Sequence, residues 1–144
     1  MRRLILTSAI LVLIDQLAKY AMDGKDYFSG FVSLHSAINY GAAFSMLEGW
    51  NKLFILVSAM VIIGILYCYK KFKNKLGLML LFSGTIGNLI DRLFLGYVRD
   101  FISVKYFATF NLADSFNVIG AALIIYFSVM EEKHQKALNS QKHK

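Results

Sequence analysis

Four long runs of apolar residues dominate the hydrophobic and polar pattern of this 144-residue chain. They occupy residues 4–22, 53–69, 76–95 and 113–130. An α-helix needs about 20 apolar residues to cross the hydrocarbon core of a bilayer, and each run approaches that length. The pattern therefore predicts an all-α membrane protein, a single domain over 1–144 with four short spans that cross the bilayer with little tilt.

Two longer connections, residues 23–52 and 96–112, separate the runs and show a different period. In the first, apolar positions alternate with small or polar ones at Val32, Leu34 and Ile38. In the second, alternation places four side chains on one side of an extended strand: Asp100, Ile102, Val104 and Tyr106. A period of two is typical of strands, so we expect a small sheet on the membrane surface, with one amphipathic turn over 42–47.

The composition supports a lipid environment. Hydrophobic residues make up 57% of the chain and charged residues only 17%, whereas soluble domains are about 45–50% apolar even with glycine counted. These values exclude a soluble domain and a disordered chain. The single cysteine, Cys68, excludes an internal disulfide, and the three histidines lack metal-ligand spacing, so we expect no metal and no cofactor.

The net charge of +7 is explained by topology better than by nucleic-acid binding, because the basic residues cluster beside the apolar runs. Ten of the sixteen lie at one set of run ends: Arg2, Arg3, Lys70, Lys71, Lys73, Lys75, Lys133, Lys136, Lys142 and Lys144. The positive-inside rule then places both termini, the 70–75 loop and a 131–144 tail in the cytoplasm. The first run resembles a secretory signal peptide but lacks a convincing cleavage site, so we interpret it as a retained span.

Ionisable residues inside spans are costly and need partners. Asp15 and Lys19 in the first span are four residues apart and lie on one helix face, where they can pair. A structural ion pair and a role in shaping a substrate site are equally compatible with this spacing.

A second stripe lies in the third span, where Gly84, Gly87, Asn88, Asp91 and Arg92 recur at steps of three and four. The glycines favour close helix packing. The three polar residues fit either a network that braces the bundle or contacts with a substrate backbone, and Arg92 beside Asp91 would hold that carboxylate ionised.

Asp100 and Asp114 form the third cluster. Asp100 lies on the expected strand after the third span, and Asp114 opens the fourth span. Taken singly, Asp114 fits a helix N-cap and Asp100 a surface charge. Because the two spans are antiparallel neighbours, both carboxylates can reach the same mouth of the bundle. Two carboxylates at one site share a proton, which is the apparatus of aspartyl peptide hydrolysis.

Three other functions are compatible with parts of this pattern. A Ser–Lys hydrolase is disfavoured because Asp15 competes for Lys19. A small proton-coupled transporter would use the same acids as a relay, but the opposite halves of the spans are almost wholly apolar. A non-catalytic adaptor would explain the glycine stripe and leave the two acids unexplained.

The chain resembles the lipoprotein signal peptidases, the type II signal peptidases of bacteria, over nearly its whole length. The resemblance rests on five ordered motifs: Asp15-Gln16-x-x-Lys19, Asn39-x-Gly41-Ala42-Ala43-Phe44, Gly84-x-x-Gly87-Asn88-Leu89-Ile90-Asp91-Arg92, Val98-x-Asp100-Phe101-Ile102 and Phe110-Asn111-Leu112-Ala113-Asp114-Ser115. Any one motif alone would be weak evidence.

The resemblance implies a membrane aspartyl endopeptidase that removes the signal peptide of diacylglyceryl-modified prolipoproteins by cleavage just before the lipidated cysteine. It implies four spans with an extracytoplasmic β-cradle over a site near the outer face of the cytoplasmic membrane. Asp100 and Asp114 match the catalytic pair. The matched supporting or substrate-binding positions are Asp15, Lys19, Asn39, Gly41, Gly87, Asn88, Asp91, Arg92, Asn111 and Ala113. The expected partners are lipid-modified prolipoproteins and membrane lipids, not nucleic acid, for a monomeric enzyme.

The chain also departs from the family pattern at several positions. Ser83 and Thr85 replace a usual glycine and alanine, Arg99 replaces an apolar residue beside the expected pair, and the stretch from Asp100 to Asp114 is short. Two further departures are Ile38 for arginine and Ala108 for proline. These changes bear on loop conformation and substrate preference more than on the chemistry.

Overall fold

The computed structural model describes residues 1–28, 30–41, 49–72 and 74–142. Its four helices are α1 (Arg2–Met22), α2 (Asn51–Cys68), α3 (Leu76–Phe94) and α4 (Leu112–Lys142). All four are long and apolar enough to cross a membrane, which confirms the predicted number of such helices among the described residues. The amphipathic turn expected over 42–47 lies outside the described residues.

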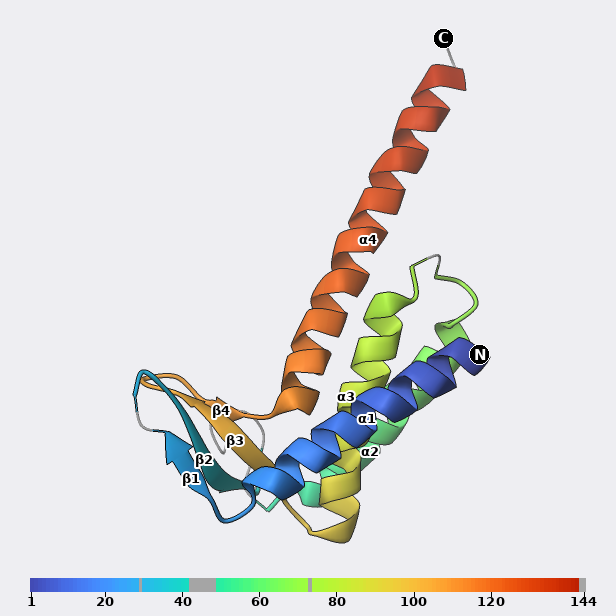
Figure 1. Ribbon diagram of the computed structural model, residues 1–144. Coiled ribbons are helices and arrows are strands. Elements are labelled where there is room, and N and C mark those ends of the chain that lie inside the picture. Colours follow the sequence, from blue (N-terminus) through green and yellow to red (C-terminus); the bar gives the residue numbers. More distant parts are fainter. Residues whose placement is uncertain (29, 42–48, 73, 143–144) are drawn as a thin grey trace.

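Helix α4 continues as one helix beyond the expected end of the span at residue 130, to Lys142. Figure 1 shows this helix projecting well past the others, with the C-terminus at its far end. Helix α3 packs against each of the other three helices and is the centre of the bundle.

Glycines explain how closely α3 and α4 pack. A Cβ atom on Gly84 would overlap the backbone carbonyl oxygen of Ala113, and one on Gly120 would lie 2.6 Å from the backbone nitrogen of Leu81. Close backbone approach through small residues drives helix association in lipid. The packing interpretation of Gly84 is therefore confirmed.

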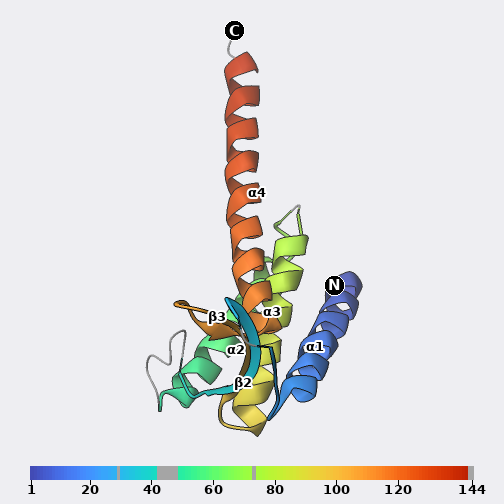
Figure 2. The ribbon, with the colours of Figure 1, turned by 60° about the vertical axis from the view of Figure 1, so that its left-hand side comes forward.

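Four strands form an antiparallel sheet in the order β1-β2-β3-β4: β1 (Asp26–Phe28), β2 (Val32–Asn39), β3 (Val98–Val104) and β4 (Thr109–Phe110). The sheet lies beside one end of the helix bundle (Figures 1 and 2). The register of β2 and β3 pairs Ala37 with Asp100 and Asn39 with Val98. The predicted strands are thus confirmed, and the sheet brings the Asp100 strand beside Asn39.

The expectation that Tyr106 shares the Asp100 strand is wrong. β3 ends at Val104, and Tyr106 adopts a left-handed conformation with φ 64° in the following turn, where its side chain is 91% exposed. The backbone reverses there to reach β4, so the alternation of side chains stops two residues early.

The two ends of the bundle interior differ in polarity. Leu4, Ile65, Tyr69 and Leu78 form an apolar cluster near the N-terminus of α1 and the α2–α3 connection. At the sheet end the largest fully buried side chains are polar: Lys19, Asp15, Asp91 and Asn111. Large apolar side chains instead cover the outside of the helices, which suits a bundle surrounded by lipid.

The α3–α4 contact can be tested with Gly84→Ala. The added methyl group meets the Ala113 carbonyl, so we expect a loss of about 1–3 kcal/mol in stability, the usual cost of overpacking. Thermal unfolding in detergent measures it. Gly64→Ala on α2 is the matched control, because nothing lies within 4 Å of the added Cβ. Equal melting temperatures for the two variants would contradict the packing argument.

Candidate active site

A buried ion cluster joins α1 to α3 at the sheet end of the bundle. Lys19 Nζ lies 2.9 Å from Asp15 Oδ2 and 3.5 Å from Asp91 Oδ2, and all three side chains are buried. Lys19 also donates to Asn88 Oδ1 at 3.0 Å. The expected ion pair of Asp15 and Lys19 is confirmed, and Lys19 is surrounded by acceptors, as a buried cation requires.

Asp15 also fixes the start of α4. Its Oδ1 accepts a hydrogen bond from the backbone nitrogen of Ala113 at 2.9 Å. The first N–H groups of a helix have no partner within the helix, and a carboxylate there is favourable. Gly87 lies at the same contact, because a Cβ there would be 2.7 Å from Asp15 Oδ2 and 3.0 Å from the Ala113 Cβ. Gly87 and Ala113 therefore form a close contact between α3, Asp15 and the start of α4.

The Asp91 carboxylate is bonded by Arg99, whereas the sequence suggested that its neighbour Arg92 would hold it ionised. Asp91 accepts from the Arg99 backbone nitrogen at 3.0 Å and from Nη2 at 2.8 Å. Gln16 Oε1 accepts from the same guanidinium at 2.9 Å. The side chains of successive helical residues point about 100° apart, so Arg92 points elsewhere. It donates to the Gly41 carbonyl at 3.3 Å and lies over the Phe54 ring.

The Asp100 carboxylate is held by two amide side chains. It accepts from Asn39 Nδ2 at 2.9 Å and from Asn111 Nδ2 at 2.7 Å, and its residue is only 3% exposed. Asn39 is itself fixed, because its Oδ1 accepts from the Gly41 backbone nitrogen at 2.9 Å. The surface-charge reading of Asp100 is therefore wrong.

Asp114 lies in the first turn of α4 and exchanges hydrogen bonds with Asn111. Its Oδ2 accepts from the Asn111 backbone nitrogen at 3.1 Å, while Asn111 Oδ1 accepts from the Asp114 backbone nitrogen at 2.9 Å. This is the reciprocal pattern of a capping box. Asn111, not Asp114, is thus the N-cap. The other Asp114 oxygen accepts from Asn88 Nδ2 at 2.7 Å.

Asn111 links the two carboxylates. Its side-chain nitrogen donates a hydrogen bond to Asp100, and its backbone nitrogen donates one to Asp114. The same Nδ2 also contacts Asn88 Oδ1 at 3.1 Å and the Arg99 carbonyl at 3.3 Å. The structure therefore brings Asp100 and Asp114 to one site, as the sequence predicted.

Burial raises the pKa of Asp100 to about 6, with a smaller contribution from the charge of Asp114. The hydrogen bond from Asn39 acts in the opposite direction. A carboxyl group with a pKa in this range exchanges its proton near neutral pH, as acid–base chemistry requires.

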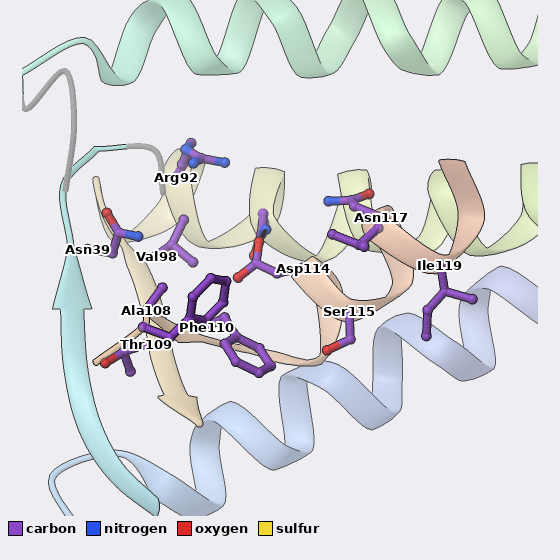
Figure 3. A pocket seen from close by; sticks show the side chains of 13 residues that line it. Asn39, Arg92, Val98, Ala108, Thr109, Phe110, Asp114, Ser115, Asn117 and Ile119 are labelled. Atoms are coloured by element: carbon purple, nitrogen blue, oxygen red, sulfur yellow. Dashed lines mark hydrogen bonds between the residues drawn. The ribbon is translucent and has the colours of Figure 1, made fainter. Parts of the chain in front are cut away.

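A cavity of about 640 Å³ opens beside this pair. Its polar lining includes Asn39, Asn88, Arg92 and Asp114, while Phe107, Phe110, Val118 and Ile119 contribute apolar walls (Figure 3). Asp100 lies behind this lining, in contact with Asn39 and Asn111. The cavity can hold an apolar ligand against the half-buried carboxylate of Asp114, with the buried carboxylate of Asp100 behind it.

Sequence reasoning missed three contributors. Gln16 and Arg99 belong to the Asp91 cluster, and Asn117 lines the cavity. The signal for Asn117 was present, because it follows Asp114 by three residues within an apolar span. In the described ranges, no group of three or more His, Cys, Asp or Glu side chains is arranged to hold a metal ion.

The fold and the paired carboxylates define a membrane-embedded aspartic peptidase. The model of the family described as signal peptidase (SPase) II matches residues 7–130. The chain therefore belongs to the signal peptidase II family, which confirms the resemblance drawn from the motifs. This membership also sets aside the transporter and adaptor alternatives.

Relatives and solved structures agree with this assignment. A lipoprotein signal peptidase of Enterococcus faecalis is 37% identical over 91% of this chain and 90% of that protein. One from Caldanaerobacter subterraneus is 41% identical over 85% of this chain and 93% of that protein. A solved bacterial membrane enzyme matches with a TM-score of 0.81 and 30% identity, covering 94% of this chain and 92% of that chain. The chain is thus a multi-pass bacterial membrane enzyme.

The ion cluster gives a stability prediction. Asp91→Ala leaves Lys19 and Arg99 without their shared anion, and we expect a loss of about 3–5 kcal/mol, as for other broken buried pairs. Unfolding of the purified protein in detergent measures it. Glu132→Ala breaks the exposed Glu132–Lys136 pair on α4 and should cost less than about 1 kcal/mol. A small effect for both variants would show that the cluster is dispensable.

The raised pKa of Asp100 gives a pH prediction. The folded chain keeps the Asp100 proton up to about pH 6, whereas the unfolded chain releases it near 3.8. Because the folded state binds the extra proton in this window, stability from this group falls as the pH rises from about 4 to about 6 and is constant above. Melting temperatures of the wild type and Asp100→Asn should differ with this slope. A difference independent of pH would contradict the raised pKa.

Proposed function

We propose that Asp100 and Asp114 are the catalytic pair of this peptidase, and that it cuts diacylglyceryl-modified prolipoproteins immediately before the lipidated cysteine. The observation that carries the proposal is the arrangement around Asn111, which joins both carboxylates beside an apolar cavity. The names of the similar proteins, lipoprotein signal peptidases, support the class of substrate.

The pair acts as one acid and one base. The ionised member takes a proton from water as the water oxygen attacks the scissile carbonyl, and the protonated member donates its proton to the developing oxyanion. When the C–N bond breaks, the first carboxyl passes the water proton to the leaving amine, and the second recovers its proton from a hydroxyl of the tetrahedral intermediate. The amides of Asn39, Asn88 and Asn111 fix the carboxylates, so little reorganisation accompanies proton transfer.

The substrate enters sideways from the bilayer. The cavity has walls from α4, at Val118 and Ile119, and from the β3–β4 region, at Phe107 and Phe110. Val118 and Ile119 lie on a membrane-spanning helix and are exposed. This continuity with the lipid-facing surface lets acyl chains stay in the hydrocarbon while the peptide reaches Asp114.

The site faces the outer side of the cytoplasmic membrane. Both termini and the α2–α3 connection lie toward one end of the molecule, and the sheet lies at the other (Figure 1). The basic residues of the terminal and 70–75 segments favour the cytoplasm for that end. The four-stranded sheet is then the extracytoplasmic cradle, and the enzyme acts as a monomer in contact with membrane lipids.

The catalytic pair is tested by Asp100→Asn and Asp114→Asn. Each change keeps the shape of the side chain and removes the ionisable group, so we expect cleavage to fall by about 10²- to 10⁴-fold, the usual contribution of one acid–base residue. The assay incubates purified enzyme with a synthetic lipidated prolipopeptide and identifies the new N-terminus by mass spectrometry.

Asp23→Asn is a matched control, because Asp23 is exposed at the end of α1. It should keep wild-type turnover. Near-normal cleavage by either dyad variant would refute the catalytic assignment, and a product that begins at any residue other than the modified cysteine would refute the proposed cut.

A further inference from the structure

A polar side chain in the fourth span has no role in the mechanism above. Asn117 lies on α4, three residues after Asp114, within an apolar stretch. Its Oδ1 accepts from Thr85 Oγ1 on α3 at 3.3 Å. The same hydroxyl lies 2.7 Å from the Leu81 carbonyl, so its one proton is shared between the two acceptor oxygens. The oxygen end of the Asn117 amide is therefore held against α3.

The nitrogen end of that amide is different. Within the described part of the chain, Asn117 Nδ2 donates to no protein atom, and no buried side-chain polar atom there lacks a partner. The amide nitrogen is thus accessible from outside the protein interior. Figure 3 shows Asn117 on the cavity wall with this nitrogen directed toward the side of Arg92 and Asp114.

Asn117 also joins two cavities. It lines the 640 Å³ cavity beside Asp114 and a second one of about 260 Å³ between α2, α3 and α4. Asn88 and Arg92 are the other residues that both cavities share. A substrate that reaches Asp114 and extends between the helices therefore passes the Asn117 amide.

An amide N–H at the depth of a membrane span is costly without an acceptor. Three residues of helix place Asn117 about 4.5 Å from Asp114 along the axis, which is close to the length of about one extended residue. The group opposite Asn117 thus lies about one residue from the scissile bond, on the hydrocarbon side. Carbonyl oxygens are the acceptors that a lipid-modified peptide offers there.

We propose that Asn117 binds the substrate, with Nδ2 donating a hydrogen bond to a carbonyl oxygen next to the scissile bond. Thr85 fixes the amide so that its nitrogen faces the cavity. The proposal rests on the proposed function, since it takes the lipidated prolipoprotein as the occupant. The carbonyl belongs either to the peptide backbone or to an acyl ester of the lipid, and both present the same acceptor.

The test compares kinetics of Asn117→Leu and Asn117→Ala with the wild type on a synthetic diacylglyceryl prolipopeptide in lipid vesicles. Loss of one neutral hydrogen bond should raise KM about 3- to 10-fold, while kcat stays within about twofold because the dyad is unchanged. Ile125→Leu is the control, since Ile125 is 65% exposed on the same helix and lines neither cavity. It should leave both constants unchanged.

A second substrate with ether-linked alkyl chains separates the two carbonyl sources. If the KM effect of Asn117→Leu persists with the ether substrate, the acceptor is a peptide carbonyl; if it disappears, the acceptor is an acyl ester. An unchanged KM for both variants overturns the proposal, as does a fall in kcat at constant KM, which would mark a structural role. If Asn117→Leu does not fold, the kinetics of Asn117→Ala provide the same test.

A different result would contradict the proposed function. If Asp100→Asn or Asp114→Asn retains cleavage, the catalytic pair is wrong while a raised KM in the Asn117 variants still stands. If both aspartate variants are inactive and the Asn117 variants keep a wild-type KM, only the binding proposal is wrong.

Discussion

The burial of Lys19 is the constraint on which the rest of the structure depends. A lysine ammonium without access to water requires anions and acceptors around it, and here Asp15, Asp91 and Asn88 supply them. Each of these partners also makes a second contact. Asp15 holds the start of α4, Asp91 holds the start of β3 through Arg99, and Asn88 holds Asp114. The charge cluster thus positions both elements that carry the carboxylates, although none of its charged members is proposed to touch the substrate.

Much of this arrangement follows from local sequence rules. The four spans follow from length and hydropathy, the Asp15–Lys19 pair from a spacing of four on a helix, and the strands from alternation. These are interactions between near neighbours or properties of a single segment. The convergence of Asp100 and Asp114 was also predictable, because an antiparallel pair of spans leaves their carboxylates at the same end of the bundle.

The predictions that the structure contradicts have a different physical origin. The pairing of Asp91 with Arg99 depends on how the chain turns between α3 and β3, which the residue types do not specify. The neighbour in sequence, Arg92, was the wrong partner because adjacent helical residues point about 100° apart. The prediction for Tyr106 is wrong for a similar reason, because this one residue adopts the left-handed conformation and ends the alternation of side chains along the strand. Asn111 was recognised only as a supporting position, because its side chain and backbone act on two carboxylates from different elements.

The reciprocal hydrogen bonds between Asn111 and Asp114 carry a consequence for how the enzyme can vary. The same contacts begin a helix and assemble the proposed chemistry, so a change that weakens one weakens the other. Neither residue can therefore be replaced without affecting both the helix start and the proposed site. Asn117 lies one turn further along the same helix and takes no part in these bonds, so its side chain can change while the start of α4 keeps its hydrogen bonds.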